Sequence, residues 1–176
     1  VIADGNSNPA WVAADLLSQA EHDKMASAVL VTDSRELAQA VSREIENQLQ
    51  TLEREEIART SIEANGKIIV ARSLTQAAAV ANRIAPEHLE LSVDDPFDYL
   101  GMIENAGSIF LGRYNPEPMG DYFAGPNHTL PTMGTARFYS PLSVDDFIKK
   151  SQFSYYTREA LEKDYRKVSR FAKEEG

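Results

Sequence analysis

Each of the three histidines in the chain stands beside other polar residues that could take part in chemistry. The first, His22, follows Gln19 by three positions, so on a helix the two side chains would share a face. An amide oxygen and an imidazole at this spacing can both reach one metal ion. A solvated helix face explains the same residues, so this pair indicates a metal site only together with other signals.

The second histidine, His88, directly follows Glu87, where a helix is expected to end and a strand to begin. Junctions between helices and strands are where α/β proteins place many active sites. Neighbouring residues of an extended chain point in different directions, so the carboxylate and the imidazole could serve two separate proton transfers. An exposed polar turn is the alternative interpretation of an isolated Glu-His pair.

The third histidine, His128, and Asp121 lie in the stretch 112–141, which is rich in glycine and proline and shows no helical or strand periodicity. A loop of this length inside a compact domain is usually functional. Gly120 allows close approach of the backbone beside Asp121, and Gly125-Pro126 predicts a turn shortly before His128. A simple connector is the alternative, but the aromatic and apolar side chains indicate packing, so we expect a functional site here.

The segments that must position these residues alternate short apolar runs with amphipathic stretches. Such alternation is typical of a layered α/β fold with helices on both faces of a sheet. Strands are expected at 29–31, 89–93 and 108–111, with a further candidate at 152–156. The dipeptide Asn65-Gly66 between two apolar runs favours a β-hairpin over 61–70.

Helices are expected to start at residues that offer a capping oxygen to the first turn, namely Asn8, Asp33, Ser73 and Thr157. Pro86 should end the helix that starts at Ser73, because proline pushes the preceding residue, Ala85, out of the helical region. The apolar positions of the last helix are expected to face a core: Leu161, Tyr165, Val168 and Phe171. We predict two parts, an α/β catalytic lobe over 1–142 and a C-terminal helical extension over 143–176.

Composition argues against several classes of function. The 18 basic and 27 acidic residues give a formal charge of −9, which disfavours nucleic acid as a partner. No apolar run approaches the roughly 20 residues that span a bilayer, so a membrane is not expected as a partner, and without a signal-peptide pattern the cytoplasm is the expected location. The sequence holds no cysteine, so disulfides and thiolate chemistry within the chain are excluded.

Three segments together resemble the histidinol dehydrogenase family: Ser18 to Asp23, Ala85 to Glu90 and Gly125 to Thr132. The resemblance runs in order over essentially all 176 residues. It implies an aldehyde-dehydrogenase-like fold with an incomplete Rossmann-type unit. It also implies oxidation of L-histidinol to L-histidine through the aldehyde, with zinc and NAD as cofactors, in a homodimer whose active site borrows residues from the partner chain.

By position, the resemblance implies zinc ligation by Gln19, His22 and Asp121, acid/base roles for Glu87 and His88, and substrate contacts by Gln19, His22, His88, Asp121 and His128. The family's fourth zinc ligand, a histidine near its C-terminus, and its N-terminal nucleotide-binding part have no counterpart in this sequence. We therefore expect a fragment that, alone, holds zinc weakly and has little or no dehydrogenase activity. The zinc hypothesis requires the three ligands to converge in the fold.

Two other interpretations stay open. A metal-free reductase of the same fold, of the glutamyl-phosphate type, would use a cysteine that this sequence lacks. A non-catalytic fragment that serves only a structural role or self-association is compatible with the same ancestry. Zinc stoichiometry and oligomeric mass would distinguish these possibilities from the enzyme.

Overall fold

A five-stranded parallel sheet organises the chain, and the computed structural model describes all of residues 1–176. The strands are β1 (Ile2–Ala3), β2 (Val29–Thr32), β3 (Lys67–Val70), β4 (His88–Ser92) and β5 (Ser108–Leu111). Their order is β3-β2-β1-β4-β5, which is the 3-2-1-4-5 part of the six-stranded Rossmann order. The predicted α/β class with an incomplete Rossmann-type sheet is confirmed.

Seven α-helices accompany the sheet. They are α1 (Pro9–Ala20), α2 (Arg35–Leu49), α3 (Glu55–Asn65), α4 (Leu74–Ile84), α5 (Pro96–Leu100), α6 (Glu117–Tyr122) and α7 (Arg158–Glu175), with short 3-10 turns η1 (Thr135–Arg137) and η2 (Val144–Phe147). The chain forms two compact units, Val1–Ser143 and Val144–Gly176. None of the helices combines the length and the apolar character needed to cross a membrane.

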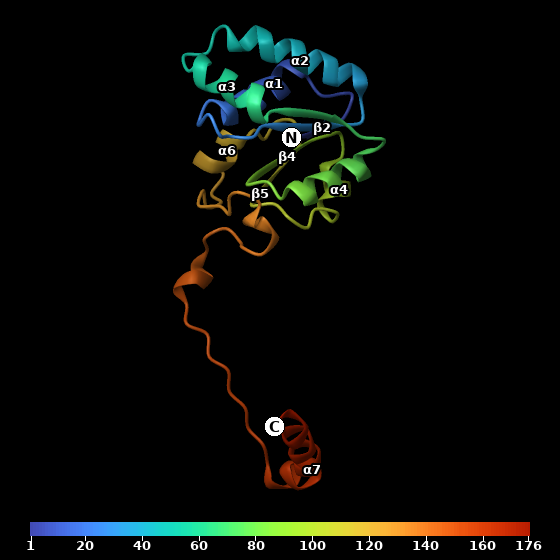
Figure 1. The fold of residues 1–176 in the computed structure, drawn as a ribbon, viewed down its shortest axis with the longest axis vertical. Coiled ribbons are helices and arrows are strands. Elements are labelled where there is room, and N and C mark those ends of the chain that lie inside the picture. The colour runs from blue at the N-terminus through green and yellow to red at the C-terminus, as the bar shows by residue number, and fades with distance from the viewer. The chain divides into compact units, whose positions relative to one another are not determined.

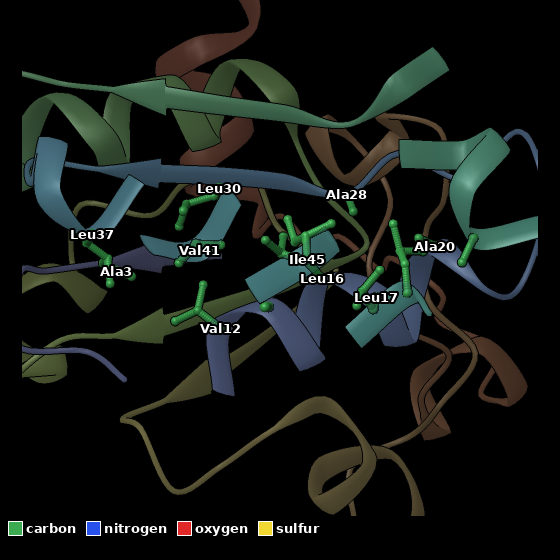
Figure 2. Close-up of a cluster of buried hydrophobic side chains, with 13 residues drawn as sticks. Ala3, Val12, Leu16, Leu17, Ala20, Ala28, Leu30, Leu37, Val41 and Ile45 are labelled. Carbon is green, nitrogen blue, oxygen red and sulfur yellow. The ribbon is translucent and has the colours of Figure 1, made fainter. Parts of the chain in front are cut away.

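The first unit has two hydrophobic clusters, one on each face of the sheet. Helices α1, α2 and α3 cover one face and α4 covers the other (Figure 1). Because successive strand residues point to opposite faces, Leu30 of β2 joins the first cluster and Val31 joins the second. Figure 2 shows the first cluster, in which Leu16, Val41 and Ile45 of the covering helices gather around Leu30.

The helix starts follow from local capping. The Asn8 side chain accepts a hydrogen bond of 2.9 Å from the amide of Ala10, and Ser73 accepts one of 3.2 Å from the amide of Gln76. Both starts are confirmed, as is the start of α7 at Thr157. Helix α2 is capped by Ser34 and not by Asp33, because the hydroxyl of Ser34 accepts the N–H of Leu37 at 3.1 Å.

Two predicted β elements are wrong. Residues 61–65 belong to α3, and β3 then pairs in parallel with β2, so there is no hairpin at Asn65-Gly66. Gly66 has a φ of −63°, so it ends a helix without the left-handed backbone that an Asn-Gly hairpin turn requires. Residues 152–156 form no strand.

The apolar face of α7 is exposed, so the prediction that it packs inward is wrong. Its four apolar side chains remain 45–74% exposed: Leu161, Tyr165, Val168 and Phe171. The unit that contains α7 has only η2 as a second regular element. A helical repeat of apolar residues shows which face can be buried, but it does not show what covers that face.

Candidate functional site

The site begins at the connection between α4 and β4. Helix α4 ends at Ile84, and Ala85 turns into the left-handed region, with a φ of 52°. Its amide donates a hydrogen bond of 2.8 Å to the carbonyl of Ala81, which closes the helix. The prediction that the helix stops before Pro86 is confirmed. Two residues later the chain enters the sheet as His88.

Backbone pairing with the segment before β5 fixes Pro86 and Glu87. The amide of Gly107 donates to the carbonyl of Pro86 at 2.9 Å, and the amide of Ser108 donates to the carbonyl of Glu87 at 2.8 Å. A Cβ atom on Gly107 would lie only 2.5 Å from the Glu87 carbonyl oxygen, so this close approach requires glycine. The backbone beside the predicted acid/base pair is therefore held rigidly.

His88 lies at the amino-terminal edge of the parallel sheet, because it is the first residue of β4. The rule about active sites in open α/β sheets concerns the carboxyl-terminal edge, so the sequence argument from helix–strand junctions is corrected. Helices that connect parallel strands run back across the sheet, so α1 and α4 both end at the amino-terminal edge. Their C-terminal carbonyls give this edge a negative field, which favours cations.

Helix α6 brings Asp121 to His88, although no helix was predicted within 112–141. The Asp121 Oδ2 atom lies 3.0 Å from Nε2 of His88 and 2.5 Å from Nδ1 of His128. The side chains of Asp121 and His88 are only 4% and 11% exposed, whereas that of His128 is 61% exposed. One buried carboxylate thus orients an inner and an outer imidazole.

These three side chains could hold a metal ion. One donor atom each from His88, Asp121 and His128 lies within 4.8 Å of the others. Two imidazole nitrogens and one carboxylate oxygen form a donor set that suits zinc. The Nε2 atom of Gln19 is buried without a hydrogen-bond partner, so its amide is available for a further contact.

Gln19 and His88 lie together between two cavities. An inner cavity of about 80 Å³ is lined by both residues and also by Asp15, Glu90 and Glu117. An outer cleft of about 560 Å³ is lined by Gln19, Glu87 and His88, and by Met133 across from them. The predicted residues Gln19, Glu87, His88, Asp121 and His128 therefore gather in one region of the fold.

His22 is not among the residues that line these two cavities. Helix α1 ends at Ala20, so Gln19 and His22 do not share a helix face, and that expectation is wrong. The chain turns instead, because the Asp23 carboxylate accepts the amide of Met25 at 2.7 Å. The backbone carbonyl of His22 accepts a hydrogen bond from Arg54 at 3.5 Å. The role of His22 as a zinc ligand stays a prediction.

Two buried acids, Glu90 and Glu117, extend the site beyond Asp121. Burial, and then the negative charge of Asp15, raise the pKa of Glu90 to about 8. Burial, and then a hydrogen bond to Asp121, raise the pKa of Glu117 to about 7. Burial opposes ionisation of Asp121 as well, but hydrogen bonds from His128, Glu117 and His88 outweigh it and lower the pKa of Asp121. Asp121 therefore stays a carboxylate that can bind a cation.

Sequence reasoning missed Glu90 and Glu117, although spacing offered a signal for both. Glu90 follows His88 by two positions in a strand, so the two side chains point to the same face of the sheet. Glu117 precedes Asp121 by four positions, which is one helical turn once α6 is known. The spacing of Glu117 and Asp121 could not be interpreted from the sequence, because no helix was predicted there.

The strand order and the imidazole–carboxylate centre together define an α/β protein with a Rossmann-type sheet and a site suited to proton transfer or metal binding. The family model described as histidinol dehydrogenase matches residues 1–176, and the chain belongs to this family. The match over the whole chain leaves the metal-free reductase interpretation without support.

Curated relatives carry the same description. A Bacillus cereus histidinol dehydrogenase is 56% identical over 176 residues, which is 100% of this chain and 41% of that protein. A relative from Caldanaerobacter subterraneus is 61% identical over 160 residues, which is 91% of this chain and 37% of that protein. The crystal structure of histidinol dehydrogenase from Elizabethkingia anophelis matches with a TM-score of 0.89 at 41% identity, covering 99% of this chain and 40% of that one. The chain thus spans about 40% of the length of these relatives.

Proposed function

We propose that residues 1–176 form the part of a histidinol dehydrogenase that holds zinc and moves protons during NAD-linked oxidation of L-histidinol to L-histidine. The observation that supports this proposal is that Gln19 and His88 both line two neighbouring cavities, while Asp121 contacts His88 at 3.0 Å. The same proposal assigns the protein to histidine biosynthesis in the cytoplasm, as a homodimer.

Gln19, His22 and Asp121 are the proposed zinc ligands. Zinc accepts nitrogen and oxygen donors, and Gln19 would bind it through its amide oxygen, because the NH2 group of an amide only donates hydrogen bonds. A bound zinc ion supplies a positive template that orients the imidazole and the amine of the substrate. His22 lies in the turn directly after α1, where its backbone amide donates to the carbonyl of Gln19 at 3.3 Å.

His88 is the proposed base of the first oxidation. Its imidazole would take the hydroxyl proton of the substrate, and NAD⁺, when bound, would supply the acceptor for the hydride that leaves carbon, which gives the aldehyde. The hydrogen bond of 3.0 Å to Asp121 fixes the ring and stabilises the imidazolium that forms.

Glu87 is the proposed base of the second oxidation. It lines the open cleft, so its carboxylate can reach a water molecule there. The carboxylate takes one proton from that water, and the resulting hydroxide adds to the aldehyde carbon. A second NAD⁺, when bound, would supply the acceptor for the hydride that the hydrate loses as it becomes the carboxylic acid. His128, which is exposed beside Asp121, is proposed to contact the substrate.

The test is a stoichiometric assay of a full-length histidinol dehydrogenase that carries these 176 residues. We expect two NADH for each L-histidinol consumed, bound zinc in each subunit, and loss of turnover on chelation that added zinc restores. The isolated chain, assayed in parallel, should show little turnover and weak zinc binding. A full-length protein that binds zinc yet produces no NADH from histidinol would reject the proposal.

A further inference from the structure

Helix α6 is seated on the sheet by contacts at its first turn and its last. The Glu90 carboxylate of β4 accepts the backbone N–H of Glu117, the first residue of α6, at 3.1 Å. At the other end, Asp121 of α6 meets His88 of β4 at 3.0 Å. Both contacts come from the same strand and from the same face of the sheet.

The spacings of the two elements match. Two residues along a strand advance by about 6.6 Å, and four residues along a helix advance by about 6 Å. His88 and Glu90 are separated by the first spacing, and Asp121 and Glu117 by the second. Two residues of β4, His88 and Glu90, can therefore contact the two ends of one turn of α6 without distorting the strand or the helix.

Between these two hydrogen-bonded ends, α6 packs closely on the sheet through Gly120. A Cβ atom on Gly120 would lie 2.2 Å from Cε1 of Phe110, so only glycine allows the helix to sit this close. Phe110 of β5 pairs with Glu90 of β4, and paired residues of neighbouring strands point to the same face. The buried Phe110 ring thus lies beside the Glu90 carboxyl under α6.

We propose that Glu90 is a positioning residue that holds the first turn of α6 and thereby sets Asp121 against His88. The inference rests on the proposed function only in taking Asp121 and His88 as site residues. Glu90 is 7% exposed, and burial of a carboxyl group is costly unless it makes hydrogen bonds. An apolar residue could fill the same space, but it would leave the buried N–H of Glu117 without an acceptor.

Two substitutions at position 90 separate hydrogen bonding from packing. Glu90→Gln keeps an acceptor oxygen for the Glu117 amide, whereas Glu90→Leu keeps the volume and removes the acceptor. In the full-length enzyme we expect Glu90→Leu to weaken zinc binding, measured by competition with a chelator, by about 10-fold to 100-fold, as for partners that orient metal ligands. We also expect kcat to fall by a similar factor, with little change in KM for NAD. Glu90→Gln should stay within about threefold of the unsubstituted enzyme in both measurements.

A matched control addresses general destabilisation. Val41→Ala opens a cavity in the cluster between α1 and α2, and Val41 itself lies on α2, which carries none of the site residues. It should lower the unfolding midpoint but leave zinc affinity and kcat unchanged. If Val41→Ala weakens zinc binding as much as Glu90→Leu, or if Glu90→Gln is as impaired as Glu90→Leu, the positioning role is rejected.

Hydrogen exchange of the unsubstituted enzyme provides a test that needs no variant. The Glu117 amide should be protected, since its N–H is buried and bonded to Glu90. Exchange at the rate of a free amide would overturn the inference, even if Glu90→Leu fails to fold. If the enzyme does not oxidise histidinol but zinc affinity and protection behave as expected, the proposed function fails and the positioning role stands.

Discussion

The two edges of the sheet are built from similar polar residues but differ in how these residues are used. At the amino-terminal edge, Asp121 faces two imidazoles beside an open cleft. At the carboxyl-terminal edge, Arg113 after β5 forms ion pairs with Asp4 after β1 and, at 2.7 Å, with Asp94 after β4. At one edge an acid is paired with imidazoles that could share a metal ion, whereas at the other edge Asp4 and Asp94 are paired with an arginine.

This difference reverses the usual arrangement of open α/β sheets. Such sheets bind ligands beyond the carboxyl ends of the strands, where the strand order reverses. In this sheet the reversal lies between β1 and β4. There the amide of Asp4 donates to the carbonyl of Ser92 at 3.3 Å, and Asp4 also accepts the amide of Asp94 at 2.8 Å. Internal bonds therefore engage Asp4 and Asp94, while a cavity of about 380 Å³ lined by acidic residues stays open beside them.

The largest expected effect follows from removing the carboxylate of the amino-terminal edge. Asp121→Ala should lower kcat and zinc affinity by more than the roughly 10-fold to 100-fold that loss of an outer partner causes. The control is Asp94→Asn at the opposite edge, which should leave zinc content and turnover nearly unchanged. Equal losses from both substitutions would break the distinction between the edges.

A smaller effect is expected at the contact between α6 and Phe110. Gly120→Ala places a methyl group 2.2 Å from the Phe110 ring, so α6 has to move away from the sheet. We expect a stability loss of about 1–3 kcal/mol, typical of overpacking, together with a loss of turnover. The double substitution Gly120→Ala, Phe110→Leu should restore most of the turnover, and a failure to do so would show that the steric account is wrong.

At the carboxyl-terminal edge, Arg113→Met should affect stability and not chemistry. The side chains of Arg113 and Asp4 are 18% and 13% exposed, so the substitution leaves a mostly buried carboxylate without its partner. Breaking a buried pair costs about 3–5 kcal/mol, and we expect about 2–3 kcal/mol here because some solvent remains. The urea midpoint should fall while kcat per folded molecule stays the same; a reduced kcat would assign this edge a role in the reaction.

The smallest effect is expected at Ala85, which enters the amino-terminal edge in a left-handed conformation. Ala85→Gly relieves about 1 kcal/mol of backbone strain. It also removes a methyl group whose burial stabilises the fold by about 0.8 kcal/mol. The urea midpoint of unfolding should therefore change little for Ala85→Gly. It should fall clearly for Ala85→Val, because valine is β-branched. An equal response to glycine and valine would show that the left-handed backbone is not under strain.

Local rules predicted much of the fold because they act within a few residues. Asn8 and Ser73 cap their helices through their own side chains, and Pro86 disfavours a right-handed helical conformation at Ala85. The hairpin at Asn65-Gly66 was wrong because the partner of β3 is β2, more than thirty residues earlier in the chain. Long-range strand pairing overrode a local turn signal, and no property of the dipeptide reveals this.

The candidate site could be predicted less completely than the fold. Glu87, His88, Asp121 and His128 were found because their residue types stand in recognisable segments, and the structure gathers them. Glu90 and Glu117 were missed because their importance depends on the packing of α6 against β4. The exposed apolar face of α7 shows the same limit, since a helical pattern does not encode what covers it.

The ends of α1 and α4 at the amino-terminal edge have a consequence for the rate of ligand capture. Their carbonyl ends and the chain's formal charge of −9 create a potential that draws positively charged molecules toward the cleft. A ligand that carries an ammonium group would then associate faster than a neutral one of the same size. Added salt should slow this association with little effect on dissociation, because screening acts on approach from a distance.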